Sequence, residues 1–388
     1  MTTTHLRVVL AIGAWLMAPL ASAQTTRTEQ IEAEKAAKAA EVRPEAREKG
    51  DLIITKIEQW LKPQPPAVRL TFGTFRPGAG FALGAASEVP VGERGLWTAS
   101  AAASVNKFKM VETAVDIPPL STDRVRLRGV ARWEDAPDLR FFGVGLDSNP
   151  ADEVGYGLRT SEAGGSVSAR IVGRWLSVGG GVTDFRVTAR DGTGSVPTVG
   201  VTASQAWWHS TAFAAFDSRH SPGYTTGGAL YRVDFHDYAD RDGASSFTRT
   251  EIDLRQFVPV LHDNWVIALQ ARADLSRAAD GQSIPFFLLP SIGGRDTLPG
   301  FENYRFTDNN SLLLRSELRW TPGPLVDMAL FLDQGTVGPT ARGLDLRDLK
   351  RSWGIGARFH GPSFTALRLE LVRSAEGWRY NIAQNVSF

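Results

Sequence analysis

The sequence contains no cysteine, although the chain is 388 residues long. This absence excludes a disulfide scaffold, a thiolate metal site and a cysteine nucleophile, and it suits a surface exposed to periplasmic oxidation. An excess of charge is missing as well, because 43 lysines and arginines stand against 42 aspartates and glutamates. A net charge of +1 gives no reason to expect nucleic acid as a partner.

Long hydrophobic runs are missing after the N-terminus, where no stretch approaches the roughly 18 apolar residues that a spanning helix needs. Residues 1–23 run from a polar start with His5 and Arg7, through the apolar stretch 8–20, to Ala21-Ser22-Ala23. This order is typical of a secretory signal peptide, and its apolar run is too short for a spanning helix. We expect cleavage after Ala23, which makes the mature chain periplasmic, secreted or a barrel.

Residues 24–66 are rich in alanine, glutamate, lysine and arginine, which favour helix, but they offer little apolar surface. Only Leu52, Ile53, Ile57, Trp60 and Leu61 share helical spacing, and the prolines at 63, 65 and 66 end that pattern. Two interpretations stay open. The segment is a solvated periplasmic lead-in, or it forms a short helix that docks at the mouth of a barrel.

Residues 67–388 show the alternation of β-strands, in segments of about ten residues separated by turn residues. In one such segment, Met328, Leu330 and Leu332 lie opposite Asp327 and Asp333. A transmembrane barrel shows this pattern because one face meets lipid and the other a polar lumen. A soluble sandwich alternates too, with its apolar face buried against a second sheet. The export signal and the C-terminus favour the barrel.

The chain ends in an alternating strand whose last residue is aromatic. Tyr380, Ile382, Val386 and Phe388 share one face of it. Outer-membrane barrels present such a terminal strand to the machinery that inserts them, so we interpret these four residues as an assembly signal. Aromatic residues near strand ends also suit the interfacial girdles of a barrel; the candidates are Trp97, Trp133, Trp207, Trp265, Trp320 and Trp378.

The pattern predicts an all-β fold, an antiparallel transmembrane barrel of sixteen strands, preceded by the signal peptide (1–23) and the short helical periplasmic segment (24–66). The predicted strands begin near Gly80, Trp97, Lys109, Val125, Glu153, Gly165, Ser177, Trp207, Thr225, Phe247, Trp265, Ser311, Val326, Arg351, Phe364 and Arg379. The longest connection, residues 278–310, falls between the eleventh and twelfth of them. A loop of that length in a compact fold usually has a function.

At this loop the sequence resembles a known family. The run IGGRDTLPGFENYRFTDNNSLLLRSELRW, followed by MALFLDQGTVG, is similar to the barrel of the BamA/TamA outer-membrane assembly superfamily, also called the bacterial surface-antigen family. Further similarity lies at residues 141–157 and 214–228, so the resemblance covers nearly all of residues 67–388. It implies a sixteen-stranded barrel in a Gram-negative outer membrane. The chain resembles reduced members that lack the repeated periplasmic modules.

In that family the loop between strands eleven and twelve folds into the lumen, where an Arg-Gly-aromatic motif at its tip contacts acidic residues on the next two strands. The resemblance places the tip at Leu298, Pro299, Gly300 and Phe301. Proline stands where the family has arginine, and proline cannot form a charge-assisted fork to a carboxylate.

The acidic partners implied by the resemblance are Glu317 and Asp333, and strand alternation also puts both on the lumen face. A pair of carboxylates in the lumen requires a cation. Arg295 and Arg305 are the candidates on the loop, while Arg315 and Arg319 share the lumen face of the twelfth strand. Otherwise the loop is held only by its glycine and phenylalanine.

The family inserts or translocates proteins at the outer membrane without a nucleotide, through a weak seam between its first and last strands. Here we expect the seam between residues 80–89 and 380–388. Gly80 and Gly84 either weaken the first of these strands or merely relieve crowding at a bend. The implied partners are outer-membrane lipid, a client polypeptide or other envelope component, and the barrel assembly machinery during the protein's own insertion.

A passive outer-membrane pore is the alternative function, because the same alternation builds one. We expect no enzyme activity, no cofactor and no metal site. The histidines lack metal-ligand spacing, and no pairing of nucleophile with histidine is evident at a membrane boundary. Glu317 and Asp333 have the residue types of a catalytic pair, but a lumen rich in arginine favours a structural ion network.

Overall fold

The computed structural model describes residues 68–118, 124–193, 203–261, 264–323, 325–361 and 365–383. The chain divides into two compact units, Met1–Gln64 and Pro65–Phe388, and every described residue belongs to the second. The predicted signal peptide, the predicted helical segment at 24–66, and Val386 and Phe388 of the predicted assembly signal lie outside the described residues.

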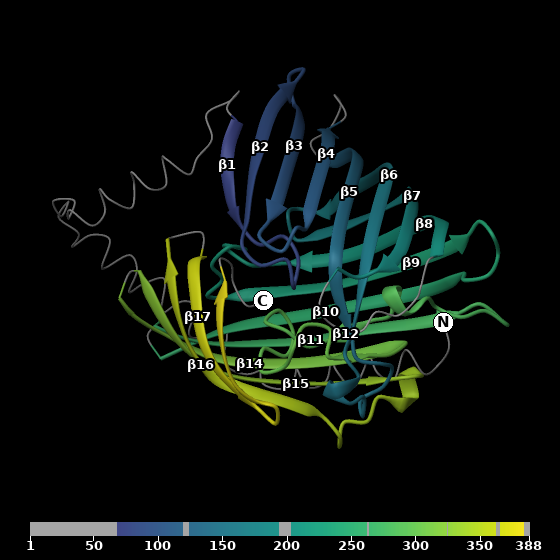
Figure 1. Cartoon of the computed structure of the whole chain (residues 1–388). Helices are drawn as coiled ribbons and strands as arrows, with labels where there is room; N and C mark the ends of the chain where they lie inside the picture. Colours follow the sequence, from purple (N-terminus) through teal and green to yellow (C-terminus); the bar gives the residue numbers. More distant parts are fainter. Residues whose placement is uncertain are drawn as a thin grey trace. The chain divides into compact units, whose positions relative to one another are not determined.

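Sixteen antiparallel strands form one curved sheet, in which each strand pairs with its neighbours in the sequence (Figure 1). In order they are β1 (Val68–Gly73), β2 (Ala82–Val91), β3 (Gly95–Ser104), β4 (Lys109–Ile117), β5 (Val125–Phe141), β6 (Val154–Val172), β7 (Leu176–Asp191), β8 (Ala203–Asp217), β9 (Gly228–Asp240), β10 (Phe247–Val260), β11 (Trp265–Ala278), β14 (Asn310–Gly323), β15 (Val326–Gly338), β16 (Lys350–His360), β17 (Thr365–Ser374) and β18 (Gly377–Ala383).

Two short strands, β12 (Ser291–Ile292) and β13 (Phe306–Thr307), form a separate two-stranded sheet. The described helices are single 3-10 turns: η1 (Pro150–Asp152), η2 (Phe286–Leu288) and η3 (Ala341–Gly343). In the part of the chain that the structure describes, no helix has the length and apolar character needed to cross a membrane. The described fold is therefore all-β.

The predicted number of sixteen strands is right, but two of the predicted boundaries are wrong. The start placed near Glu153 falls one residue before β6, and the start placed near Gly165 falls inside that same strand, because Gly164 and Gly165 pair in register with β7 instead of forming a turn. The six-residue strand β1 went unpredicted, since it is short and follows directly on the prolines at 63, 65 and 66. One surplus strand and one missed strand leave the predicted number of strands at sixteen.

The alternation along the strands is inverted relative to a soluble protein. On β15, Met328 and Leu330 are 41% and 57% exposed, whereas Asp327 and Asp333 are each 1% exposed. On β17, Leu369 and Leu371 point outward while Arg368 and Glu370 are buried inside. An apolar outer face with charged residues within is the arrangement of a barrel in lipid, and it excludes the sandwich interpretation.

Of the six candidate girdle tryptophans, four lie on or against the outer face and one lies inside the barrel. Trp97, Trp320 and Trp378 are exposed on the outer face, and Trp265 stacks on Trp320 with ring centroids 5.8 Å apart. Trp207 is fully buried inside the barrel instead, and its indole nitrogen donates to the Ser245 carbonyl at 3.0 Å. The prediction for Trp207 was wrong because nearness to a strand end says nothing about which face a residue occupies.

Candidate functional site

The long connection between β11 and β14 folds as a β-hairpin whose neck is the β12–β13 pair. Figure 1 shows β12 inside the curve of the large sheet. Just beyond the neck, the Gly294 amide donates to the Phe301 carbonyl at 3.2 Å, and the Thr297 hydroxyl accepts from the Gly293 amide at 2.8 Å. Gly293 has a φ of 126° and Gly294 a φ of 88°, and residues with a side chain rarely adopt such positive values. Two consecutive glycines thus set the bend of this hairpin.

An apolar cluster fastens the hairpin to the inner wall. Leu298 is fully buried and Phe301 is 3% exposed. They pack with two residues of the hairpin neck and two of the wall strands β14 and β15: Ile292, Phe306, Leu313 and Val337. The rings of Phe301 and Phe306 meet edge to face, with centroids 5.2 Å apart. The predicted tip residues therefore lie within the barrel.

Gly300 lies against β16 and β17 with no room for a side chain. A Cβ at this position would lie 2.6 Å from Cβ of Ser374 and 2.8 Å from Cβ of Ser352. The Ser374 hydroxyl also donates to the Gly300 carbonyl at 2.6 Å. Glycine at a tight tip often serves to adopt positive φ, yet Gly300 does not have positive φ. Its requirement is close approach to the wall.

Asp333 is bound to the hairpin through Arg315. The Arg315 guanidinium donates to both carboxylate oxygens, at 3.0 Å and 3.3 Å, in a fork that only arginine can make. A third nitrogen of the same group donates to the Asp296 carbonyl on the hairpin at 3.4 Å. Asp333 thus holds Arg315, and Arg315 holds the hairpin main chain.

Glu317 lies between two wall arginines. Arg319 donates to it at 2.5 Å, and Arg358 of β16 forms an ion pair with the same carboxylate. All three side chains are at most 3% exposed. Removing one charge of such a group is costly because the others stay buried without compensation. The arginines occupy the carboxylate oxygens, and the geometry is that of a structural ion network.

The two loop arginines that we considered as partners for these carboxylates bind elsewhere. Arg295 donates to the Ile382 carbonyl on β18 at 3.3 Å. Arg305 forms an ion pair with Glu376 at 2.7 Å and donates to the Ser148 hydroxyl at 2.9 Å. Both cations therefore tie the hairpin to other parts of the barrel, while wall arginines neutralise the carboxylates.

Pro299, which replaces the family's arginine, is buried against the last strand. Its carbonyl accepts a hydrogen bond from the side-chain amide of Asn381 on β18 at 3.3 Å. Proline lacks only the amide hydrogen, so its carbonyl remains available as an acceptor. The departure from the family pattern thus leaves a main-chain contact to β18 in the place of a charged fork.

The first and last strands of the sheet each have one hydrogen-bonded neighbour among the described strands. β1 pairs with β2, and β18 pairs with β17. The predicted seam partner, residues 80–89, falls largely on β2, so this prediction was wrong: the seam lies between β1 and β18. Both edges carry exposed apolar side chains, including Leu70 at 85% and Tyr380 at 83%.

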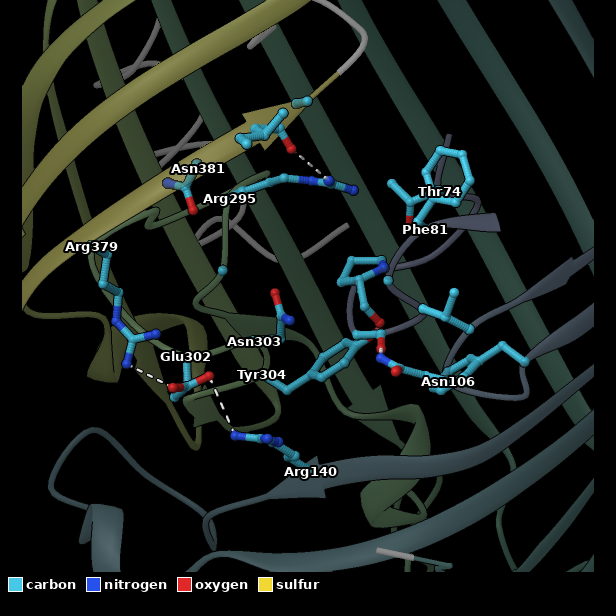
Figure 2. A pocket seen from close by; sticks show the side chains of 18 of the residues that line it. Thr74, Phe81, Asn106, Arg140, Arg295, Glu302, Asn303, Tyr304, Arg379 and Asn381 are labelled. Atoms are coloured by element: carbon cyan, nitrogen blue, oxygen red, sulfur yellow. Dashed lines mark hydrogen bonds and ion pairs between the residues drawn. The ribbon is translucent and has the colours of Figure 1, made fainter. Parts of the chain in front are cut away.

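A cavity of about 1430 Å³ lies along this seam. Its lining comes from the end of β1 and the following loop, from the hairpin, and from β18 (Figure 2). In Figure 2, Arg140 and Arg379 flank Glu302 of the hairpin, at 3.4 Å and 2.7 Å. The cavity wall thus combines charged hairpin residues with the first and last of the described strands.

Tyr304 joins the hairpin to the β1 side of the seam. Its hydroxyl donates to the Pro77 carbonyl at 3.3 Å and accepts from Arg76 at 3.4 Å. Arg76 also pairs with Glu134 at 2.7 Å. Burial alone would lower the pKa of Arg76, but Tyr304 and Glu134 outweigh it and raise that pKa. Arg76 therefore stays charged, and the hairpin contacts both sides of the seam.

Several residues that hold the hairpin were not singled out by the sequence pattern. Ser352 and Ser374 make room for it, and Arg76 binds its Tyr304. A serine at an inward-facing position of a strand is common, so the sequence alone does not mark it as a contact of the hairpin. The described residues contain no group of three or more His, Asp or Glu side chains that is able to hold a metal ion.

A curved sheet of sixteen described strands with an apolar outer face and a lumen hairpin, whose first and last strands each have one neighbour among those strands, defines a class of bacterial outer-membrane barrel. The family model of the Omp85 superfamily domain matches residues 98–374. The chain therefore belongs to the Omp85 superfamily, whose barrels lie in the Gram-negative outer membrane.

Solved structures share the fold at low sequence identity. BamA from Haemophilus ducreyi lacking POTRA domains 1-3 is 15% identical with a TM-score of 0.62, over 86% of this chain and 76% of that one. CdiB from Acinetobacter baumannii is 15% identical with a TM-score of 0.54, over 82% and 58%. CdiB from Escherichia coli is 13% identical with a TM-score of 0.54, over 84% and 61%.

The chain thus spans about six tenths of each CdiB chain. No curated protein matches the sequence.

Proposed function

We propose that this protein inserts or translocates polypeptides at the outer membrane, through the seam between β1 and β18. One observation carries the proposal. Within the described strands, the outer edges of β1 and β18 have no strand partner, and a cavity of about 1430 Å³ lies beside them. An unpaired edge offers a row of backbone donors and acceptors on which an incoming strand can pair.

Between the described parts of β1 and β18, the hairpin supplies contacts in place of strand pairing. It binds β18 through the Arg295 guanidinium and the Pro299 carbonyl. It binds the loop after β1 through Tyr304. These are a few separable hydrogen bonds, each contributing about 1 kcal/mol, rather than a continuous ladder. Such a seam can open without unfolding the sheet, which suits passage of a client into the bilayer.

The alternative, a passive pore, fits the lumen less well. The hairpin and its apolar cluster pack inside the barrel against β14 and β15. A second apolar cluster, which includes Phe108, Leu139 and Trp207, lies inside the barrel and packs against residues 286–288 of the long connection. A pore for small solutes needs a continuous water-filled path, and buried apolar clusters oppose one.

Site-specific photocrosslinking in living cells tests the proposal. A photoreactive residue placed at Leu70 or at Tyr380 reports on the two seam edges. The matched control is Leu330, which is 57% exposed on the outer face of β15, a strand that is paired on both sides. We expect discrete polypeptide adducts from both edge positions and none from the control.

Adducts that are equally frequent at the three positions contradict the proposal, as does trapping of lipid alone. Single-channel recording separates the two functions further. A steady, large conductance from the purified barrel supports the pore, whereas small and brief openings support the plugged assembly barrel.

A further inference from the structure

A second connection enters the barrel from the end opposite to the hairpin. Residues 218–227 join β8 to β9, and they are longer than the other connections at that end. Because neighbouring strands are antiparallel, a loop after the eighth strand and a loop after the eleventh open at opposite ends. In outer-membrane barrels, long loops join the strands at one end, and the connections at the other end are usually short turns. The extra length of this segment therefore calls for a structural or functional reason.

Tyr224 of this loop packs on the far wall of the barrel. Its ring stacks on His360, at the end of β16, with centroids 3.9 Å apart and planes 11° from parallel. Its hydroxyl donates to the Asp327 carboxylate, at the start of β15, at 3.0 Å. Burial raises the pKa of Tyr224 to about 12, so the hydroxyl remains a donor at neutral pH.

Asp327 gathers further donors beneath the loop. The Thr321 hydroxyl donates to it at 2.7 Å, and Nε2 of His360 lies 3.3 Å away. Asp327 itself is 1% exposed. Hydrogen bonds to an ionised acceptor are stronger than those between neutral groups. The tyrosine is thus fixed by a buried anion as well as by ring stacking.

The main chain of the loop is held by two more wall residues. Arg319 of β14, which also binds Glu317, donates to the Thr225 carbonyl at 3.1 Å. Thr365, at the start of β17, donates to the Gly223 carbonyl at 3.4 Å. Thr225 is 3% exposed. These contacts all reach β14 to β17, although the loop leaves the sheet at β8 and β9.

This path requires the loop to cross the bore. In the sheet order, β14 to β17 are the twelfth to fifteenth of sixteen strands, and the loop leaves between the eighth and ninth. In a barrel of sixteen strands, positions eight strands apart face one another, so strands four to seven places after β8 lie part or most of the way across the lumen. We propose that residues 218–227 form a second plug, which closes the end of the barrel opposite to the hairpin and is latched by Tyr224 on Asp327 and His360.

Planar-bilayer recording of the full-length barrel tests this plug. Tyr224→Phe removes the hydrogen bond to the anion and keeps the ring, while Tyr224→Ala removes both. A hydrogen bond to a charged group contributes about 1.5–3 kcal/mol, so we expect the open fraction to rise roughly tenfold to a hundredfold in Tyr224→Phe. Tyr224→Ala should raise it further. The matched control is Tyr231→Ala, which removes the same atoms from β9.

A crosslink keeps the test decisive if a variant fails to assemble. Because the protein has no cysteine, Gly223→Cys with Thr365→Cys introduces one defined pair. A short bifunctional thiol reagent with a reducible linker should join the pair and suppress openings, and reduction should restore them. If the crosslink does not form, or if Tyr224→Ala conducts like Tyr231→Ala and the unmodified protein, residues 218–227 do not plug the barrel.

Discussion

Adding a single methyl group at Gly300 should displace the hairpin from the barrel wall. The new Cβ would lie 2.6 Å from Cβ of Ser374 and 2.8 Å from Cβ of Ser352. Carbon atoms in contact need about 3.5–4.0 Å, so the hairpin must move by about 1 Å. Neither serine can yield by rotating its side chain, because a Cβ is fixed by its own backbone.

Two costs add in the Gly300→Ala variant. Overpacking a filled interior typically costs about 1–3 kcal/mol. The movement also weakens the 2.6 Å hydrogen bond from the Ser374 hydroxyl to the Gly300 carbonyl. Such a bond contributes about 1 kcal/mol. We expect the free energy of unfolding to fall by about 2–4 kcal/mol, and in Gly300→Leu it should fall further.

Urea titration of the folded, heat-modifiable band on gels measures this loss. Gly323→Ala is the matched control, because a Cβ there meets nothing within 4 Å and Gly323 does not have positive φ. The same Gly300→Ala change in a Ser352→Gly, Ser374→Gly background should cost little, since both obstructing atoms are gone. The steric explanation is refuted if Gly300→Ala behaves like Gly323→Ala, or if the serine substitutions fail to reduce its cost.

Four further predictions concern other parts of the molecule. Glu317→Ala leaves Arg319 and Arg358 buried without their anion, so it should destabilise the barrel by about 3–5 kcal/mol in the same titration; a change under about 1 kcal/mol would contradict the proposed ion network. Tyr304→Phe removes the bonds to Arg76 and Pro77 and should increase photocrosslinking from Leu70 and Tyr380; unchanged yields argue against the hairpin as a seam contact. Deleting residues 24–66 should leave the heat-modifiable band intact, and failure of the shortened chain to assemble in liposomes would show that the segment is structural. The native protein should fractionate with the outer membrane, and recovery as a soluble periplasmic species would overturn the membrane interpretation.

Alternation along the sequence was sufficient to predict the class of fold. A lipid-facing strand must place apolar and polar side chains on opposite faces, so β15 shows its membrane face directly in the spacing of Met328, Leu330 and Leu332. The same rule assigned Glu317 and Asp333 to the lumen face, where both are buried. The motif around residues 292–338 predicted the superfamily, and the family model confirmed it.

Strand boundaries were harder to predict, because alternation with a period of two residues does not show at which residue a strand begins to pair with its neighbour. The split of β6 at its paired glycines and the omission of β1 both came from treating glycine and proline as interruptions. The omission moved the predicted seam onto β2. Which strands form an edge depends on the complete pairing order, so one missed strand relocates the functional opening.

The partners of the charged residues were decided by the tertiary structure. The sequence places Arg295, Arg305 and Arg315 near two carboxylates, and nothing in their spacing distinguishes them. In the folded barrel Arg315 meets Asp333 across adjacent strands, while the hairpin carries the other two to β18 and to the β17–β18 turn.

Gly300 illustrates the same division between what alternation determines and what folding decides. Its position in the motif was evident from the sequence, but the reason for glycine is the proximity of Ser352 and Ser374, more than fifty residues away along the chain. Alternation is a local property of one strand, set by which side of it meets lipid. A contact across the lumen depends instead on how sixteen strands close around the hairpin, which no local pattern encodes.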